Sequence, residues 1–234
     1  MQKIMLTMDV VDNFMVEEAL KTLRTNIQFY GRDIHVIGIT STTENEGKSF
    51  VSLNVAHSFA ELGKRVLLVD ADMRLSVMAN HSNIGRDVDG LSEVLAGVKS
   101  VNDCLNATQY ENLHVMFAGH YPPNPSELLG SKYFAEMLHV ARKMYDYIIV
   151  DTPPLGVVVD AALAATACDG MAIVVGDEKI SYRRVREVVD QLKKSQCRIL
   201  GVIRNNVDVE KKRYSHKYYG SYTKDLGKKG IFKK

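Results

Sequence analysis

Gly47, Lys48 and Ser49 are the residues of this 234-residue chain whose types and order point most directly to chemistry. They follow a short apolar run at 35–40 and open a run with helical spacing at 48–62. Backbone N–H groups at such a strand-to-helix turn point at a bound phosphate, and the helix dipole adds partial positive charge. We therefore expect a phosphate loop in which Lys48 reaches the β- and γ-phosphates and the Ser49 hydroxyl binds Mg²⁺.

The expected loop departs from the general pattern of phosphate loops at its start. Thr42 stands where the pattern has its first glycine, and Asn45 stands where glycine is common. Because Asn tolerates positive φ better than most residues, the turn can still form there. At the end of a predicted strand, Asn205 has an amide that could hold the adenine edge, or it could be an ordinary turn residue. The residues expected to bind the nucleotide are Thr42, Thr43, Glu44, Asn45, Glu46, Gly47, Lys48, Ser49, Phe50 and Asn205.

Three aspartates end two further apolar strands. Asp70 and Asp72 close the run at 65–70, and Asp151 follows the run at 147–150. Proteins with phosphate loops hold Mg²⁺ near the γ-phosphate in this way, although a strand-ending aspartate can also cap the next helix. Three such acids beside a phosphate loop favour the metal site. We predict Ser49, Asp72 and Asp151 as metal ligands, and Lys48, Asp70, Asp72 and Asp151 as the catalytic residues.

Asp70 and Asp72 could divide the work of phosphoryl transfer between them. This reaction needs positioning and neutralisation of charge more than covalent catalysis. A carboxylate near the acceptor can orient its hydroxyl and take the proton late in the reaction. We favour Asp70 as the base and Asp72 as a partner of water on the metal, and the opposite assignment stays open.

The elements that must position these groups alternate along the chain. Apolar runs predict strands at 35–40, 65–70, 113–117, 147–150, 171–175 and 199–203. Helical spacing predicts helices at 16–30, 48–62, 90–96, 125–144, 160–167 and 182–195. Near-continuous apolar strands that alternate with helices indicate a single doubly wound α/β domain, with a mostly parallel sheet covered by helices on both faces. With the phosphate loop, this is the P-loop NTPase fold.

Charge is divided unequally along the chain. The net charge is +2, with 46% hydrophobic and 25% charged residues, which is ordinary for a soluble globular protein. The segment 211–234 alone carries nine Lys or Arg against one acid, Asp225, so it contributes +8. We expect a helical segment at 1–30, a P-loop domain at 31–209 and a flexible basic tail at 210–234.

The cysteines, the histidines and the lengths of the apolar runs argue against a disulfide-rich protein, a metal cluster and a membrane-spanning segment. The three cysteines lie far apart and fit neither a disulfide framework nor a metal spacing, and the seven histidines are scattered and suggest no metal cluster. No apolar run approaches the ~20 residues that span a bilayer. The expected location is the cytoplasm, and a membrane location would have to come from a partner.

Four tyrosines are packed among the cations of the basic tail, namely Tyr214, Tyr218, Tyr219 and Tyr222. The tail could be a solvated basic segment, a nucleic-acid contact by stacking and cations, or a set of phosphate acceptors, which we favour. Each phosphotyrosine adds roughly −1.5 to −2 charges, so four of them would nearly cancel the charge of the tail. We predict that phosphorylation favours dissociation of an oligomer.

These motifs resemble those of the bacterial tyrosine kinases (BY-kinases), in the form whose cytosolic kinase is separate from its membrane activator. The family usually has Pro-Gly where this chain has Glu44 and Asn45. Segment 70–74 is similar to the family's D-x-D-x-R motif. The resemblance covers nearly the whole chain and rests on 46–49, 70–74, 90–97, 122–129, 145–154 and the tyrosine cluster.

The resemblance implies a function and a set of partners. ATP·Mg²⁺ would bind at the loop, Asp70 or Asp72 would act on a tyrosine hydroxyl, and Asp151 with Ser49 would hold the metal. Tail tyrosines of one subunit would be phosphorylated by a neighbour. The family implies a transmembrane adaptor that recruits the kinase to the inner face of the membrane, a cognate tyrosine phosphatase, other protein substrates, and a role in capsule or exopolysaccharide assembly. Nucleic acid is not expected as a partner.

One motif of the family is altered near the N-terminus. Its members carry an E-x-x-R-x-x-R helix that packs subunits into a ring, and the matching residues here are Glu18, Lys21 and Arg24. Lysine keeps the charge of arginine but not its planar fork, so the oligomer is expected to be weaker. A surface helix with an i, i+3 ion pair is the simpler alternative.

Two other functions compete with the kinase. An ATPase of the chromosome-partitioning or cell-division-site type shares this fold, but such switches place a second lysine at the position of Thr43. A binding module for nucleic acid or a membrane surface would use the basic tail, and it leaves the phosphate loop and the aspartates unexplained.

Overall fold

Four apolar runs form the centre of the sheet. In the computed structural model, β2 (Val36–Ser41), β3 (Val66–Asp70), β6 (Tyr147–Asp151) and β7 (Gly170–Gly176) lie side by side and are parallel. Almost all of their residues are buried, as expected for strands that are covered on both faces. The structure describes residues 1–234 except 9, 11–12, 86, 177–180 and 208–234.

Shorter strands complete the sheet at its edges. One edge is β8 (Arg198–Asn205), and beyond β3 lie β5 (Leu113–Met116), β4 (Asn106–Ala107) and β1 (Gln2–Lys3). The strand order is β1-β4-β5-β3-β6-β2-β7-β8, and among the described strands only β4 and β5 pair antiparallel. The predicted mostly parallel sheet is confirmed. The sequence did not predict β1 or β4, because two-residue strands leave no periodic signal.

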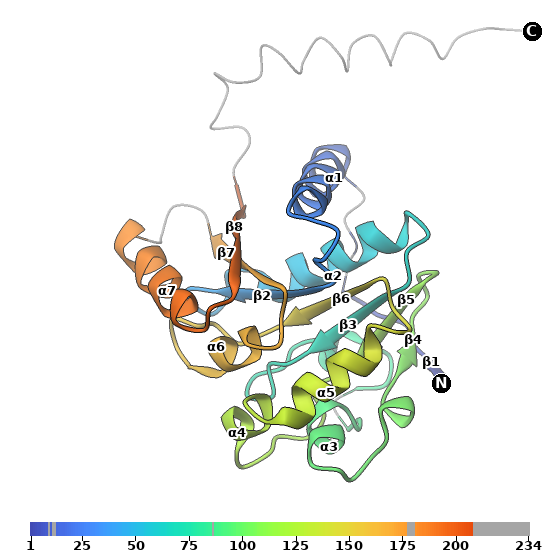
Figure 1. Ribbon diagram of the computed structural model, residues 1–234. Helices are drawn as coiled ribbons and strands as arrows, with labels where there is room; N and C mark the ends of the chain where they lie inside the picture. The colour runs from blue at the N-terminus through green and yellow to red at the C-terminus, as the bar shows by residue number, and fades with distance from the viewer. Residues whose placement is uncertain (9, 11–12, 86, 177–180, 208–234) are drawn as a thin grey trace, which may run out of the picture.

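Helices cover both faces of this sheet (Figure 1). On one face α1 (Phe14–Phe29) packs against α2 (Lys48–Ala60). The other face carries α3 (Leu91–Leu95), α4 (Pro125–Leu129), α5 (Lys132–Ala141), α6 (Asp160–Ala165) and α7 (Tyr182–Lys194). Two short 3₁₀ helices, Ala79–His81 and Val101–Asp103, lie in the connections on either side of α3.

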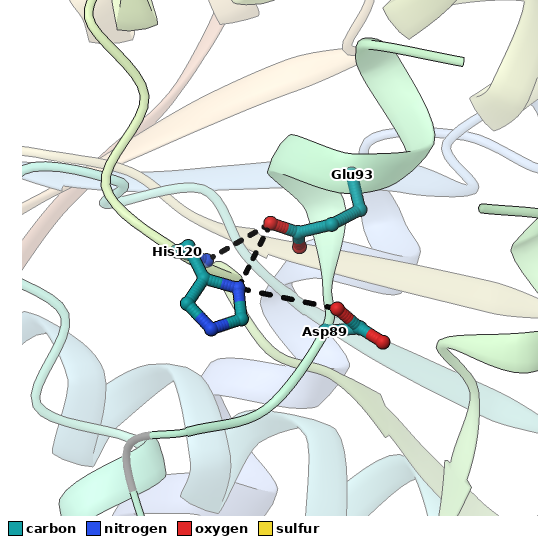
Figure 2. Close-up of side chains that lie close together, drawn as sticks. All are labelled: Asp89, Glu93 and His120. Atoms are coloured by element: carbon teal, nitrogen blue, oxygen red, sulfur yellow. Dashed lines mark hydrogen bonds and ion pairs between the residues drawn. The ribbon is translucent and has the colours of Figure 1, made fainter. Parts of the chain in front are cut away.

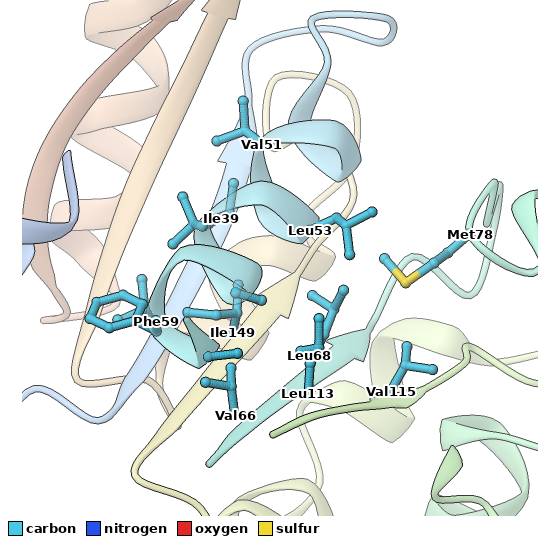
Figure 3. Packing of buried hydrophobic residues seen from close by; sticks show 14 of the residues in the cluster. Ile39, Val51, Leu53, Phe59, Val66, Leu68, Met78, Leu113, Val115 and Ile149 are labelled. Carbon is cyan, nitrogen blue, oxygen red and sulfur yellow. The ribbon is translucent and has the colours of Figure 1, made fainter. Parts of the chain in front are cut away.

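Alternate side chains of each central strand enter two different cores. In β3, Val66 and Leu68 pack in the core beneath α2, together with Phe59 (Figure 3). Their neighbours Leu67 and Val69 pack in the core beneath α3–α6. Burying each such side chain contributes roughly 1.5–3 kcal/mol, so both helix layers hold the sheet that carries the site.

The prediction of one helix over 125–144 is wrong. The chain forms α4 and α5 instead, with a break at Gly130 and Ser131. Ser131 is extended, with φ −77° and ψ 157°, which is the conformation of a residue that begins a new helix. The combination of Gly and Ser in this run is the signal that periodicity alone overlooked.

Candidate functional site

The loop between β2 and α2 has the backbone conformation of a phosphate loop. Gly47 caps α2 with φ 82°, and Asn45 has φ 60°, which is the positive φ expected of it from the sequence. A Cβ on Gly47 would lie 2.1 Å from Nδ2 of Asn205. Glycine is therefore favoured at this position by its conformation, and a side chain there would also have to displace the Asn205 amide.

The Glu46 carboxylate braces this loop from the inside. Its Oε2 accepts hydrogen bonds from the backbone N–H groups of Thr42 (2.6 Å) and Thr43 (2.7 Å), and its Oε1 accepts one from Gly176 (3.0 Å). The Glu46 carbonyl accepts a hydrogen bond from Nδ2 of Asn205 at 2.9 Å. Glu46 is only 3% exposed. Glu46 is among the residues expected at the nucleotide; its side chain is used inside the protein, so its backbone is the part that remains for a phosphate.

The remaining residues expected at the nucleotide are spread around the loop. Glu44 and Asn45 are exposed at its tip. Phe50 lies in the first turn of α2, and its partly buried side chain packs against the core beneath this helix. Asn205 ends β8 and lies against Gly47, so the structure brings it to the loop, and the adenine contact considered for its amide stays a prediction.

Lys48 joins the loop to the strand-ending aspartates. Its Nζ lies 2.9 Å from Oδ2 of Asp72, 3.9 Å from Oδ2 of Asp151 and 3.4 Å from the Ser49 hydroxyl. Asp70 and Asp151 end the neighbouring strands β3 and β6 and are paired in register. The structure thus brings together every residue predicted to be catalytic or to bind metal.

Hydrogen bonds fix the orientation of each carboxylate. Ser52 of α2 donates its hydroxyl to Oδ1 of Asp151 at 3.0 Å. Oδ2 of Asp70 accepts a hydrogen bond from the Ser76 hydroxyl at 2.5 Å, and its Oδ1 accepts one from the backbone N–H of Asp72 at 3.0 Å. The Asp70 carboxylate is therefore already held beside a hydroxyl group.

The acidic groups carry more negative charge than Lys48 neutralises. Burial, together with the nearby charge of Asp151, raises the pKa of Asp70 to about 7. Burial likewise raises the pKa of Asp151. Burial would lower the pKa of Lys48, but the charges of Asp151 and Asp72 outweigh it and raise that pKa. An anionic, oxygen-rich site of this kind fits Mg²⁺, which Ser49, Asp72 and Asp151 would hold.

Arg74 clamps the segment that carries Asp72, a role the sequence analysis missed. Its Nε and Nη2 lie 2.6 Å and 3.2 Å from the two carboxylate oxygens of Asp160, at the start of α6. Its Nη2 also donates to the Ser126 hydroxyl at 2.9 Å. Asp160 is fully buried. The arginine of the D-x-D-x-R pattern was the available signal, but its partners are distant in sequence.

The residues predicted to make oligomer contacts divide into two groups. Glu18 and Lys21 form an exposed ion pair on α1, with their charged atoms 2.8 Å apart. Arg24 instead turns inward and donates a hydrogen bond from Nη1 to the Ser58 carbonyl of α2. Its Nε is buried without a hydrogen-bond partner among the described residues. Arg24 therefore packs α1 onto α2.

The predicted phosphate acceptors Tyr214, Tyr218, Tyr219 and Tyr222 lie outside the described residues. Within the part of the chain that is described, the helices are too short or too polar to cross a membrane.

Comparisons with known proteins place the chain in a family. The family model for an AAA domain matches residues 34–206. Tyrosine-protein kinase CpsD of Streptococcus agalactiae is 38% identical over 94% of this chain and 97% of its own length. Tyrosine-protein kinase CpsD of Streptococcus pneumoniae is 40% identical over 89% of this chain and 92% of its own length. Tyrosine-protein kinase YwqD of Bacillus subtilis is 36% identical over 89% and 87% of the two chains.

Solved structures agree in fold. The kinase domain of Escherichia coli tyrosine kinase ETK aligns with a TM-score of 0.78 and 33% identity, over 82% of this chain and 75% of that one. The chimerical protein CapA2B2 aligns with a TM-score of 0.77 and 32% identity, over 81% of this chain and 84% of that one. The cell division ATPase MinD of Pyrococcus furiosus aligns with a TM-score of 0.62 and 25% identity, over 74% of each chain. This chain belongs to the bacterial tyrosine-protein kinases, with their P-loop fold.

Proposed function

We propose that this protein is an ATP-dependent protein-tyrosine kinase that phosphorylates the tyrosines of its own C-terminal segment in a neighbouring subunit. Through this reaction it would regulate the assembly and export of capsule or exopolysaccharide. The observation that carries the proposal is Lys48, held between Asp72 and Asp151 beside a phosphate loop, with Asp70 at the end of the next strand.

The loop and Lys48 would hold ATP. Backbone N–H groups around Gly47 would bind the phosphates at the start of α2. The buried ammonium of Lys48 stays charged because Asp151 and Asp72 raise its pKa, so it can balance charge that builds up on the γ-phosphate. When bound, Mg²⁺ supplies positive charge against the β- and γ-phosphates.

Asp70 would act as the base that accepts the proton of the tyrosine. It already accepts a hydrogen bond from the Ser76 hydroxyl, which is the contact that an acceptor hydroxyl would make. A pKa of about 7 suits a general base that works near neutral pH. Asp72 pairs with Lys48 instead, which supports a role for it at the phosphate side.

The transfer balances without any further reactant. The phenolic oxygen forms a bond to the γ-phosphorus, and the bond from that phosphorus to the β–γ bridging oxygen breaks. The proton of the tyrosine passes to Asp70, and ADP leaves. The products are phosphotyrosine and ADP, as in other phosphoryl transfers to hydroxyl groups.

The proposal also covers partners and location. Tyr214, Tyr218, Tyr219 and Tyr222 would be the acceptors, and Glu18 and Lys21 would contribute to an oligomer that phosphorylation weakens. A transmembrane adaptor would recruit the kinase from the cytoplasm to the inner face of the membrane, and a tyrosine phosphatase would reverse the reaction. These partners follow from the family resemblance.

Intact mass after incubation with Mg·ATP tests the kinase. Wild-type protein should gain phosphates that map to residues 214–222, and Lys48→Met should gain none. Lys64→Met, which removes an exposed lysine after α2, is the matched control and should behave as wild type. Wild-type protein that gains no phosphate, even with the cytosolic segment of an adaptor added, would contradict the proposal.

A mixing experiment tests transfer between subunits. Lys48→Met supplies intact acceptor tyrosines, and a second variant with the four tail tyrosines changed to Phe supplies an intact active site. If transfer occurs between chains, phosphate should appear on Lys48→Met only when both variants are present. Phosphate that appears on wild type but never on Lys48→Met in the mixture would restrict the reaction to one chain.

A switch ATPase of the cell-division type is the second candidate. The likeness to MinD structures supports it, including one from Pyrococcus horikoshii described as complexed with Mg-ADP. Thr43 stands where such switches have their second lysine, which argues against it. Hydrolysis of ATP without any phosphate on the protein would favour this alternative.

A further inference from the structure

A second cluster of charged side chains lies where β5 and α3 approach each other, outside the nucleotide site. Asp89 precedes α3, Glu93 lies within α3, and His120 follows β5 on the loop that leads to α4. In Figure 2, Nδ1 of the imidazole faces the carboxylates of Glu93 and Asp89. Nδ1 of His120 lies 3.1 Å from Oε1 of Glu93 and 3.9 Å from Oδ1 of Asp89. One ligand atom of each residue lies within 4.8 Å of the others.

The Glu93 carboxylate is fixed by the surrounding structure. Its Oε2 accepts a hydrogen bond from the backbone N–H of Gly90 at 2.7 Å, and its Oε1 accepts one from the Ser92 hydroxyl at 2.9 Å. Only 14% of the side chain is exposed. A Cβ at Gly119 would lie 2.2 Å from Oε2 of Glu93, so glycine makes room for the carboxylate there. Such support orients a metal ligand before the ion arrives.

Carboxylates on both sides determine which form of the His120 ring is present. Nε2 lies 2.9 Å from Oδ1 of Asp87, and Nδ1 lies 3.1 Å from Oε1 of Glu93. An ionised carboxylate can only accept, so without a metal ion each ring nitrogen carries a hydrogen. A metal ion would take the place of the Nδ1 hydrogen and supply the positive charge that Asp89 and Glu93 face. A carboxylate on the far nitrogen is the usual partner of a histidine that binds metal.

The charge and the donor atoms of the cluster select the type of ion. Among the described residues, Asp87, Asp89 and Glu93 are paired with Lys99, whose Nζ lies 2.8 Å from Oδ2 of Asp89, and with His120. The net charge of these five side chains is −2 once Nδ1 of His120 has given up its hydrogen to a metal ion. Mg²⁺ and Ca²⁺ prefer oxygen ligands alone. An imidazole nitrogen with two carboxylates suits Zn²⁺ and its first-row neighbours.

We propose that Asp89, Glu93 and His120 form a binding site for a divalent first-row transition-metal ion, with Zn²⁺ as the reference ion. The ion would join α3 to the loop between β5 and α4. That loop leads to Ser126, whose hydroxyl contacts Asp160 at 2.6 Å in the clamp made by Arg74. The site would therefore stabilise the loop beside the nucleotide site, and it does not depend on kinase activity.

Titration with Zn²⁺ against a chromophoric chelator tests the site. The full chain is used with saturating Mg·ADP, so that the nucleotide site is occupied. Wild-type protein should bind one Zn²⁺ that His120→Asn and Asp89→Asn each weaken by about 10- to 100-fold. His139→Asn and Asp190→Asn remove an exposed histidine and an exposed, ion-paired aspartate elsewhere and should not weaken it. Equal Zn²⁺ binding by wild type and His120→Asn would overturn the proposal.

A second measurement separates a metal site from a network held together by a proton. Zn²⁺ should raise the Tm of wild type and of His139→Asn, and it should leave the Tm of His120→Asn unchanged. Co²⁺ should give visible absorption bands with wild type that His120→Asn lacks. If His120→Asn lowers the Tm without metal, while Zn²⁺ and Co²⁺ have no effect on wild type, His120 is a protonated bridge and the proposal is wrong.

Discussion

The two sides of the nucleotide site satisfy their polar groups in opposite ways. On the loop side, the Glu46 carboxylate accepts hydrogen bonds from three backbone N–H groups, and its carbonyl accepts one from Asn205. On the acidic side, Asp70, Asp72 and Asp151 face one ammonium group within the described part of the chain, that of Lys48.

On the loop side, the polar groups named above have partners within the protein. On the acidic side, part of the negative charge is left for a ligand to neutralise. The loop is braced by its own protein, so its shape should persist without nucleotide. The acidic side holds buried charge that burial makes unfavourable, so it should respond to pH and to divalent cations. The comparison predicts that stability depends most on the loop side, and that the response to pH depends on the acidic side.

The largest effect should come from Glu46→Ala. This change leaves the N–H groups of Thr42, Thr43 and Gly176 without their acceptor, and each lost partner costs roughly 1–3 kcal/mol when buried. We expect the free energy of unfolding to fall by about 3 kcal/mol or more in urea denaturation. Nucleotide binding should weaken as well, because the loop loses its brace.

Two variants calibrate the Glu46 result. Glu46→Gln keeps the shape and one acceptor oxygen, so it should lose about half as much stability as Glu46→Ala. Glu61→Ala, in an exposed position at the end of α2, should change stability little. If Glu46→Ala unfolds at the same urea concentration as Glu61→Ala, the brace does not stabilise the loop.

Asp70→Asn should reveal the unfavourable charge on the acidic side. Burial raises the folded pKa of Asp70 to about 7, so the stability that its proton provides is present at pH 4 and is lost as the pH rises through 7. Asn carries no such charge. Without Mg²⁺, the free energy of unfolding of the variant should therefore exceed that of wild type by an amount that rises with pH. This difference should be near zero at pH 4 and roughly 1–3 kcal/mol at pH 8.

Urea denaturation at several pH values measures this difference. Asp33→Asn changes an exposed, ion-paired aspartate far from the site and should not produce the same dependence on pH. Mg·ADP should reduce the advantage of Asp70→Asn, because the cation neutralises charge in wild type. A stability difference between Asp70→Asn and wild type that stays constant from pH 4 to pH 8 would mean that burial does not raise the pKa of Asp70. Asp70→Asn should also abolish phosphorylation if Asp70 is the base.

The sequence predicted the centre of the molecule better than its connections. The long strands β2, β3, β6 and β7 are buried on both faces, so each appears as an apolar run. Because strand ends meet at one edge of a parallel sheet, the sequence could also predict that Lys48 and the aspartates would gather. The two-residue strands β1 and β4 left no such signal.

Contacts between distant side chains could not be predicted in the same way. The bracing role of Glu46, the pairing of Arg74 with Asp160, and the meeting of Asp89 with His120 all depend on where side chains point after folding. In the sequence the histidines appear scattered, and the structure brings one of them between two carboxylates. Spacing along the chain carries no information about such contacts.

Arg74→Lys compares a clamp at the site with a similar clamp away from it. Arg74 forms a two-pronged contact with Asp160, and Arg142 forms one with Asp169. Lysine keeps the charge but not the fork, so each Arg→Lys variant should lose about 1–2 kcal/mol of stability. Only Arg74→Lys should also slow autophosphorylation, by about tenfold, because Arg74 positions the segment of Asp72. Equal rates for Arg74→Lys and Arg142→Lys would contradict this role.

The smallest effect should come from Glu44→Gln, at the exposed tip of the loop. Glu44 places a negative charge on the loop that must bind phosphates, where the family usually has an uncharged residue. Because the side chain is exposed, water and salt screen this charge, and its removal should tighten ADP binding only about two- to fivefold at low salt. The gain should disappear at high salt, and Glu61→Gln, at the far end of α2, should show none at either salt concentration. If ADP binding by Glu44→Gln stays tighter than wild type at high salt, Glu44 acts through the shape of the loop and not through its charge. The exposed tip of the loop would then influence the shape of the loop, as Glu46 does from its buried side.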